Sequence, residues 1–384
     1  MTLMLLASAL TCLIIFVTLG RELGVFSDRF DSVREYAALL ANIDELYIGD
    51  YLRADVSSAA NKAAVMALGD RWSYYLTPEE YVKYLDSSNN RFAGIGITAV
   101  IDEETGGMLV ASVYKGSAAD EGGLAAGDVI VKIDGEDITG LDFDEMRSML
   151  ARPIGDTVTL DVLSEDGGAQ TLEVVYSFVF VDPVEYEMLD GDIGYVMLAN
   201  FESGAANSFI AAVEDLAGQG AAAMIFDVRG NGGGRVSEMT RILDFLLPEG
   251  EIFISVHKSG NEEITMSGPD MFSMPCAVLV DRYSYSAAEY FAATLSEYGY
   301  AAVVGEQTTG KNRSQVTVTM PSGGALHISS GEYLTKNRVS LYAQGGFTPD
   351  HEVSLEDEQF ALLIAGQLEK ENDAQLIKAI ETLK

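Results

Sequence analysis

The chain has 384 residues, 48% of them hydrophobic, so it can fill the cores of two or three domains and is not expected to be disordered. Its 59 acidic and 24 basic residues give a net charge of −35, which disfavours nucleic acid as a partner, although such a charge also serves solubility. Two cysteines exclude a disulfide framework, and three histidines without a metal-ligand spacing argue against a zinc site.

The N-terminal segment, residues 1–20, carries no charged side chain and is long enough to cross a bilayer as a helix. It lacks a basic start and a clear cleavage site, which favours an uncleaved membrane anchor over a removed signal, with a secreted form as the alternative. Arg21 and Arg29 follow the segment and leave its orientation open, since the positive-inside rule would place them in the cytoplasm.

The next two regions differ in pattern. Residues 21–90 have helical spacing, and residues 77–80 (TPEE) mark a helix start with Thr as the cap and Pro in the first turn. We expect a helical arm that serves dimerisation rather than catalysis. Residues 91–177 change to short alternating runs between Gly, Asp and Ser clusters, with one helix at 142–151, and they predict a small β-rich domain.

From residue 178 to residue 355 strands and helices alternate, which predicts an α/β domain with a largely parallel sheet. Two further helices are expected in residues 356–384. The chain is therefore expected to be a multi-domain α+β protein. Helices are predicted at 205–216, 236–246, 287–298 and 356–368, and strands at 277–280 and 301–304.

Ser286 lies where the strand at 277–280 passes into a helix, and it has two interpretations. It can be a helix N-cap, with Glu289 completing a capping box. It can instead be a nucleophile, with Lys311 as its general base and the helix start stabilising an oxyanion. A lysine base must be neutral, and burial beside Val303 and Val304 would lower its pKa.

Other side chains and loops could complete such a site. If the chain is extended from Lys311 to Gln315, both side chains lie on one face, and Gln315 could orient the amine. Residues 227–234 (DVRGNGGG) follow a strand and are either an anion cradle or a tight turn. They match neither a P-loop nor a dinucleotide fingerprint. A Ser-His-Asp triad is disfavoured because no G-x-S-x-G elbow occurs.

Several motifs together resemble the carboxyl-terminal processing (tail-specific) serine proteases. They are GDRWSYYLTPEEY, FAGIGI, GSAADEGGLAAGDVIVKIDG, DVRGNGGG, SYSAAE, GEQTTGKNRSQ and FTPDHEV, in one order at family-like spacings. The resemblance implies a PDZ domain and a ClpP/crotonase-like protease core. It also implies Ser286 as nucleophile, Lys311 as base, Gln315 as its positioner, and an oxyanion hole from the N–H groups of Gly233 and Ala287. The sequence differs from the family at two places. Gly232 stands where the family usually has proline, and residues 312–314 stand where the family more commonly has small residues.

The same resemblance implies a peptide-binding groove in the PDZ domain. Gly94, Ile95, Gly96 and Ile97 resemble a carboxylate-binding loop followed by a strand that can pair with a peptide. Met146 and Leu150, on the helix at 142–151, are expected to face the groove, although such apolar residues could simply be core.

The sequence thus predicts a serine endopeptidase that recognises proteins or peptides by nonpolar C-terminal tails. It is expected to be a single-pass protein of the cell membrane with an extracytoplasmic catalytic part, without nucleic acid, metal or other cofactor. A homodimer through the N- or C-terminal helices is a further expectation. The alternative is a non-catalytic membrane-anchored scaffold that binds peptides through the PDZ domain.

Overall fold

The computed structural model describes residues 28–164 and 167–384. The predicted membrane anchor at residues 1–20 lies outside these ranges. Within them, none of the helices combines the length and the apolar character that crossing a bilayer requires.

The chain divides into two compact units, residues 1–61 and 62–384. The first contains α2 (Asp28–Leu46) and the start of α3 (Arg53–Met66), which continues into the second, and Arg53 forms an ion pair with Asp44. No residue of α3 is buried, and Leu39 and Leu46 of α2 are exposed. The helical character predicted for this region is confirmed for α2 and α3, whereas its role in dimerisation stays a prediction.

A six-stranded sheet is the centre of the second unit, in the order β10-β11-β12-β15-β16-β19. β10 (Val184–Leu189) is antiparallel to β11, and the other strands run parallel, as predicted. Four of the parallel strands are largely buried and read as apolar runs, which is why they could be located in the sequence, whereas the two-residue polar strand β19 was not predicted. The parallel strands are β11 (Ile193–Leu198), β12 (Ala223–Asp227), β15 (Cys276–Val280), β16 (Ala301–Gly305) and β19 (His351–Glu352).

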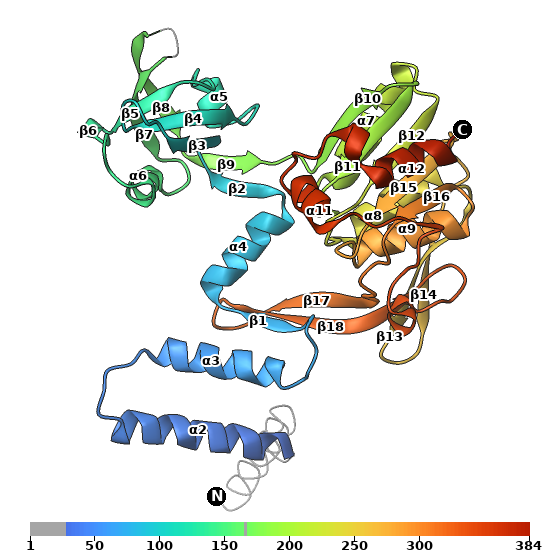
Figure 1. Cartoon of the computed structure of the whole chain (residues 1–384). Coiled ribbons are helices and arrows are strands. Elements are labelled where there is room, and N and C mark those ends of the chain that lie inside the picture. The colour runs from blue at the N-terminus through green and yellow to red at the C-terminus, as the bar shows by residue number, and fades with distance from the viewer. Residues whose placement is uncertain (1–27, 165–166) are drawn as a thin grey trace, which may run out of the picture. The chain divides into compact units, whose positions relative to one another are not determined.

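Helices cover both faces of this sheet (Figure 1). In β12, Met224 and Phe226 join the core beneath three helices, while Ala223 and Ile225 join the core beneath α12. The three predicted helices are confirmed as α7 (Ala205–Gly218), α8 (Val236–Leu246) and α9 (Ala287–Glu297), and α12 spans Ala374–Thr382. α11 (Asp357–Ile364) is shorter than the predicted helix at 356–368.

A second sheet corrects the expectation that residues 21–90 are helical throughout. β1 (Tyr74–Leu76) pairs with β18 (Ala325–Leu334), and α4 (Pro78–Ser88) begins only after Thr77, which caps it as predicted. A three-residue strand has no period of its own, so its pairing with a distant strand could not be read locally. The remaining strands are β13 (Gly250–His257), β14 (Glu262–Ser267) and β17 (Arg313–Thr319).

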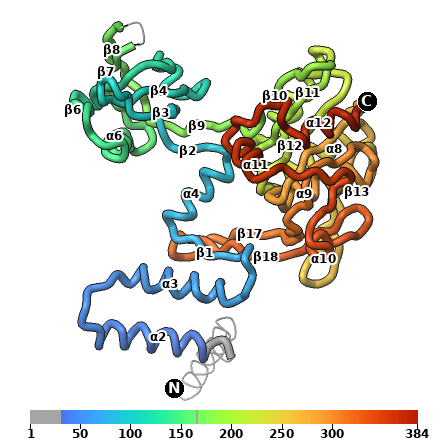
Figure 2. The backbone as a smooth tube through the Cα atoms, viewed as in Figure 1, coloured from blue at the N-terminus to red at the C-terminus, as the bar shows by residue number. Residues whose placement is uncertain are grey.

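The β-rich domain has a sheet in the order β3-β4-β5-β7-β8, with β6 paired to β5. The chain enters and leaves it through paired strands β2 (Arg91–Gly94) and β9 (Ser177–Phe180) (Figure 2). Its other elements are β3 (Ile97–Ile101), β4 (Met108–Val113), α5 (Ala118–Glu121), β5 (Val129–Ile133), β6 (Glu136–Asp137), α6 (Phe143–Leu150), β7 (Thr157–Leu163) and β8 (Ala169–Val175).

Candidate active site

Ser286 occupies the turn between β15 and the N-terminus of α9, as the sequence predicts. Its backbone has φ 59° and ψ −122°, a strained conformation for a residue with a side chain. Such strain is kept where the surrounding structure fixes it, and it is concentrated at functional sites. The Ser286 N–H donates to Glu289 Oε1 at 3.0 Å, so the glutamate of the predicted capping box is used at this helix start.

The glycine loop after β12 lies against Ser286. Gly233 has φ 88°, and a Cβ there would lie 2.8 Å from the Ser286 Cβ and 2.9 Å from the Ala287 nitrogen. Only glycine fits this approach. The Gly233 N–H donates to Asn231 Oδ1 at 2.8 Å, whereas the Ala287 N–H has no acceptor among the described residues. The two predicted oxyanion donors therefore lie side by side, and one of them is engaged within the loop.

Lys311 follows β16 and places its amine against aromatic rings. The Nζ atom lies 4.5 Å from the centroid of the Trp72 ring and 5.8 Å from that of Tyr285. In the described part of the chain it forms neither a hydrogen bond nor an ion pair, so it is not bonded to Ser286. Burial lowers the pKa of Lys311 to about 8, although Glu289 and Asp70 act in the opposite direction.

Gln315 does not contact the lysine amine through its own amide group. Its Nε2 donates to the Arg313 carbonyl at 2.9 Å and to Ser329 Oγ at 3.2 Å. The assignment of Gln315 as the positioner of Lys311 stays a prediction.

Glu289, predicted from the sequence only as a capping partner, connects the segments that carry Ser286 and Lys311. Its side chain is fully buried on α9, and burial raises its pKa, while the hydrogen bonds it accepts oppose that rise. Oε1 accepts the N–H groups of Ser286 and Lys311, and Oε2 accepts the Thr308 hydroxyl and the Gly310 N–H. One carboxylate thus fixes the backbone of the predicted nucleophile and the backbone of the predicted base.

Trp72 is a second residue of the site whose role was not predicted from the sequence. Its ring centroid lies 5.5 Å from that of Tyr285, directly before Ser286. The segment that carries Trp72 is held by β1, and by the Ser73 hydroxyl, which accepts the Ser329 N–H. A cavity of about 310 Å³ adjoins this site. Its lining includes Asp70, Arg71, Trp72, Gly310, Asn312 and Arg313.

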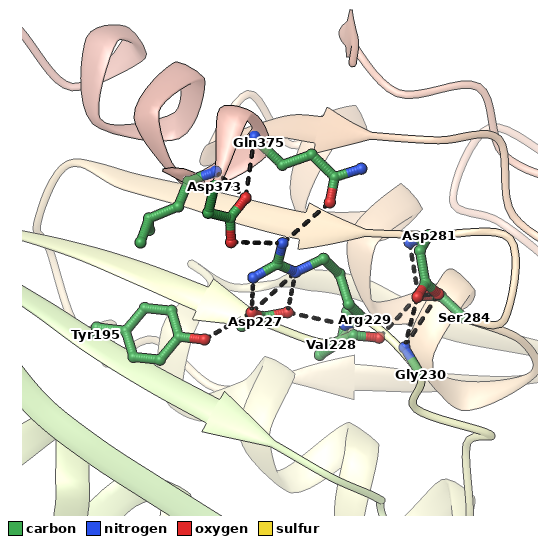
Figure 3. A network of polar contacts seen from close by, with 10 residues as sticks. Tyr195, Asp227, Val228, Arg229, Gly230, Asp281, Ser284, Asp373 and Gln375 are labelled. Atoms are coloured by element: carbon green, nitrogen blue, oxygen red, sulfur yellow. Dashed lines mark hydrogen bonds and ion pairs between the residues drawn. The ribbon is translucent and has the colours of Figure 1, made fainter. Parts of the chain in front are cut away.

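A buried polar network holds the glycine loop in place (Figure 3). Arg229 donates to both oxygens of Asp227, pairs with Asp373 at 2.8 Å and donates to Gln375 Oε1 at 3.0 Å. The Gly230 N–H donates to the Asp281 carboxylate at 3.0 Å. The loop is therefore connected to the N-terminus of α12 through charged groups that are almost completely buried.

The β-rich domain contains the predicted groove, a cavity of about 490 Å³ whose lining includes Gly94, Ile95, Gly96, Ile97 and Leu150. β3 is an edge strand, and the N–H groups of Ile95 and Gly96 have no acceptor in residues 28–164 and 167–384. Met146 does not line the cavity as expected; it is fully buried in the domain core, because it lies on the inner side of α6.

Comparison with known proteins agrees with these features. Residues 192–353 match peptidase family S41, and residues 109–164 match a PDZ domain. The chain is 27% identical over 288 residues to the carboxy-terminal processing protease CtpA of Bacillus subtilis, covering 74% of this chain and 61% of that protein. It is 28% identical over 316 residues to the carboxyl-terminal-processing protease of Synechocystis, covering 80% and 74% of the two chains.

A solved structure shows the same fold. It is a protein of Bacteroides fragilis assigned to the S41 proteases, with a TM-score of 0.52 and 21% identity, over 85% of this chain and 89% of that chain. The S41 and PDZ matches, joined with these relatives, place the chain in the family of carboxyl-terminal processing serine proteases that contain a PDZ domain.

Proposed function

We propose that this chain is an endopeptidase in which Ser286 is the nucleophile and Lys311 the general base. The observation that carries the proposal is the Glu289 carboxylate, which holds the Ser286 and Lys311 backbones together at the head of α9. The lysine has a pKa of about 8 because it is buried, so an appreciable fraction is neutral near neutral pH. A neutral amine is the form that can accept the serine proton.

In the proposed reaction, neutral Lys311 takes the Ser286 hydroxyl proton as the oxygen attacks a peptide carbonyl. The Ala287 N–H, free at the helix N-terminus, stabilises the oxyanion, and Gly233 would join it on releasing Asn231. The lysine ammonium then protonates the leaving amine, which gives an acyl-enzyme. A water molecule, deprotonated by the same amine, attacks the ester and restores the Ser286 hydroxyl.

The PDZ groove supports recognition of substrate C-terminal tails. The N–H groups of Ile95 and Gly96, which have no acceptor in the described part of the chain, suit a terminal carboxylate, and edge strand β3 suits pairing with an extended peptide. The surrounding apolar lining favours a nonpolar terminus. An anchor at residues 1–20 and an extracytoplasmic catalytic part belong to the same proposal, supported by the apolar, uncharged character of that segment.

The deciding experiment is cleavage of an unfolded protein with a nonpolar C-terminal tail, by the wild-type chain and by Ser286→Ala. We expect turnover in the wild type and none above background in the variant. Fluorophosphonate labelling should likewise require Ser286. Equal residual turnover in the two proteins would leave a peptide-binding scaffold as the function.

The pH dependence of Ser286 reactivity should follow the ionisation of Lys311. Because burial lowers its pKa to about 8, the neutral fraction rises with pH below that value and then saturates. We expect the rate of fluorophosphonate labelling to increase about tenfold per pH unit on the acid side and to become constant above it. Lys311→Met should label slowly at every pH. A wild-type rate independent of pH between about 6 and 9 would exclude the lysine base.

Arg147 should make the groove prefer tails that carry an additional negative charge. It is the only charged residue in the groove lining, it is exposed, and no carboxylate among the described residues pairs with it. An exposed charge pair contributes up to about 1 kcal/mol, so an acidic residue within the tail should tighten binding by about 2- to 5-fold.

The measurement is peptide binding by fluorescence anisotropy to Ser286→Ala, which cannot turn the peptide over. Matched tails would contain Glu or Gln, each with a free or amidated terminus. Arg147→Gln should remove the Glu preference and leave the effect of amidation unchanged. A Glu preference that survives in Arg147→Gln would show that another group provides it.

A further inference from the structure

Trp72 is the only tryptophan in the chain, and its ring contacts the amine of Lys311. The lysine amine lies 4.5 Å from the centroid of the Trp72 ring and 5.8 Å from that of Tyr285. Both distances are within the range in which the face of an aromatic ring attracts a cation. Among the described residues the amine has no hydrogen-bond or ion-pair partner, and these two rings are the contacts recorded for it.

We propose that Trp72 is a positioning residue that holds the Lys311 ammonium away from Ser286 and releases the amine when it loses its proton. This inference concerns regulation of the proposed active site and therefore rests on the proposed function. The attraction depends on charge: the ring quadrupole binds an ammonium and has little hold on a neutral amine. The protonated lysine, which cannot act as a base, is therefore bound against the ring. The neutral amine is free to turn towards Ser286.

The segment around Trp72 is fixed well enough to act as a support. The Asp70 carboxylate accepts hydrogen bonds from the backbone N–H of Trp72 at 3.2 Å and from the Ser73 hydroxyl at 2.6 Å. It also forms an ion pair with Arg313 at 3.6 Å. β1 then joins the segment to β18. The backbone that carries the ring is thus held by Asp70 and by β1, so movement of the lysine side chain alone can break the contact.

The charged and titratable groups near Lys311 come from several elements. The Glu289 carboxylate on α9 and the Asp70 carboxylate favour the ammonium, and Arg71, which lies 4.1 Å from the Trp72 ring centroid, disfavours it. Burial, with a contribution from Lys311 itself, lowers the pKa of His327 on β18 to about 4, so this ring is neutral near pH 8. Burial raises the pKa of Tyr333, whose hydroxyl donates to the Lys311 carbonyl.

The test weakens the attraction of the ring while keeping its shape. Tryptophan analogues with one, two or three ring fluorines, introduced at codon 72 of the full chain, keep the indole outline and lower its negative potential. Less attraction for the ammonium means a lower pKa of Lys311. The midpoint of the acid limb of Ser286 labelling should therefore move stepwise to lower pH, by about 0.5 to 1 unit for the most fluorinated ring.

A second readout does not depend on catalysis. Trp72 fluorescence in the unsubstituted chain, or the ¹⁹F resonance of the fluorinated one, should change with pH at the Lys311 midpoint. The step should persist in Ser286→Ala, because the lysine is held by the ring and not by the serine, and it should vanish in Lys311→Met. If these pH-dependent changes in the Trp72 signal persist in a chain without peptidase activity, the proposed function is rejected, while the charge-dependent contact between Trp72 and Lys311 remains supported.

Three results would overturn the inference. The step could survive in Lys311→Met, which would assign it to another group. The midpoint could be the same for all fluorinated rings, which would mean that the ring only fills space. The step could disappear in Ser286→Ala, which would mean that the ammonium is held by the serine. Trp72→Phe provides a folded comparison with a weaker ring, and its midpoint should lie between those of the unsubstituted and the most fluorinated chains.

Discussion

Glu289→Gln is expected to lower kcat/KM by about 10²- to 10³-fold and the free energy of unfolding by about 2 to 4 kcal/mol. The two carboxylate oxygens accept four donors, two at each oxygen. A glutamine has the same shape, but its NH₂ group must face either the Ser286 and Lys311 N–H groups or the Gly310 N–H and Thr308 hydroxyl. Each buried donor without an acceptor costs about 1 to 3 kcal/mol.

The measurements are steady-state cleavage and calorimetric unfolding of the full chain. Glu297→Gln is a matched control, because Glu297 lies on the same helix and accepts the Thr335 hydroxyl at 2.6 Å and the Asn337 N–H at 3.0 Å, away from Ser286. We expect Glu297→Gln to change stability slightly and turnover little. Unchanged kcat/KM in Glu289→Gln would contradict the role of Glu289 in fixing the nucleophile and the base.

The strand–helix–strand unit around Ser286 could be predicted closely from the sequence. β15 and β16 are buried on both faces, so they appear as apolar runs. α9 begins directly after Ser286, where the predicted capping box marks a helix start. Local chemistry determines these features, and the strain at Ser286 is the one local property that residue types do not reveal.

The contacts that complete the site could not be predicted, because they join distant segments. β1 exists only through its pairing with β18, and Trp72 reaches Lys311 because of that pairing. Glu289 was visible as a capping residue, yet its contacts with Lys311 and Gly310 depend on how the loop after β16 folds back. Met146 illustrates the opposite error, since an apolar residue on the groove helix was assigned to the groove and belongs to the core.

Removing the Asp373 carboxylate should strongly destabilise the protease domain. Asp373 caps α12, accepting the N–H groups of Gln375 and Leu376 at 3.0 Å, and it pairs with buried Arg229. Loss of an N-cap costs about 1 kcal/mol, and breaking a buried pair by removing one partner costs about 3 to 5 kcal/mol. With both contributions lost, we expect Asp373→Ala to lower the free energy of unfolding by about 4 to 6 kcal/mol.

Asp373→Asn separates the two contributions, because asparagine is as good an N-cap as aspartate but carries no charge. The free energy of unfolding should fall by about 1 kcal/mol less in Asp373→Asn than in Asp373→Ala, because asparagine keeps the cap on the N–H groups of Gln375 and Leu376. Arg229 directly precedes Gly230 in the glycine loop, so Asp373→Ala should also slow fluorophosphonate labelling of Ser286 at temperatures where the chain remains folded. Normal labelling in a destabilised Asp373→Ala would show that α12 stabilises the fold without positioning the oxyanion loop.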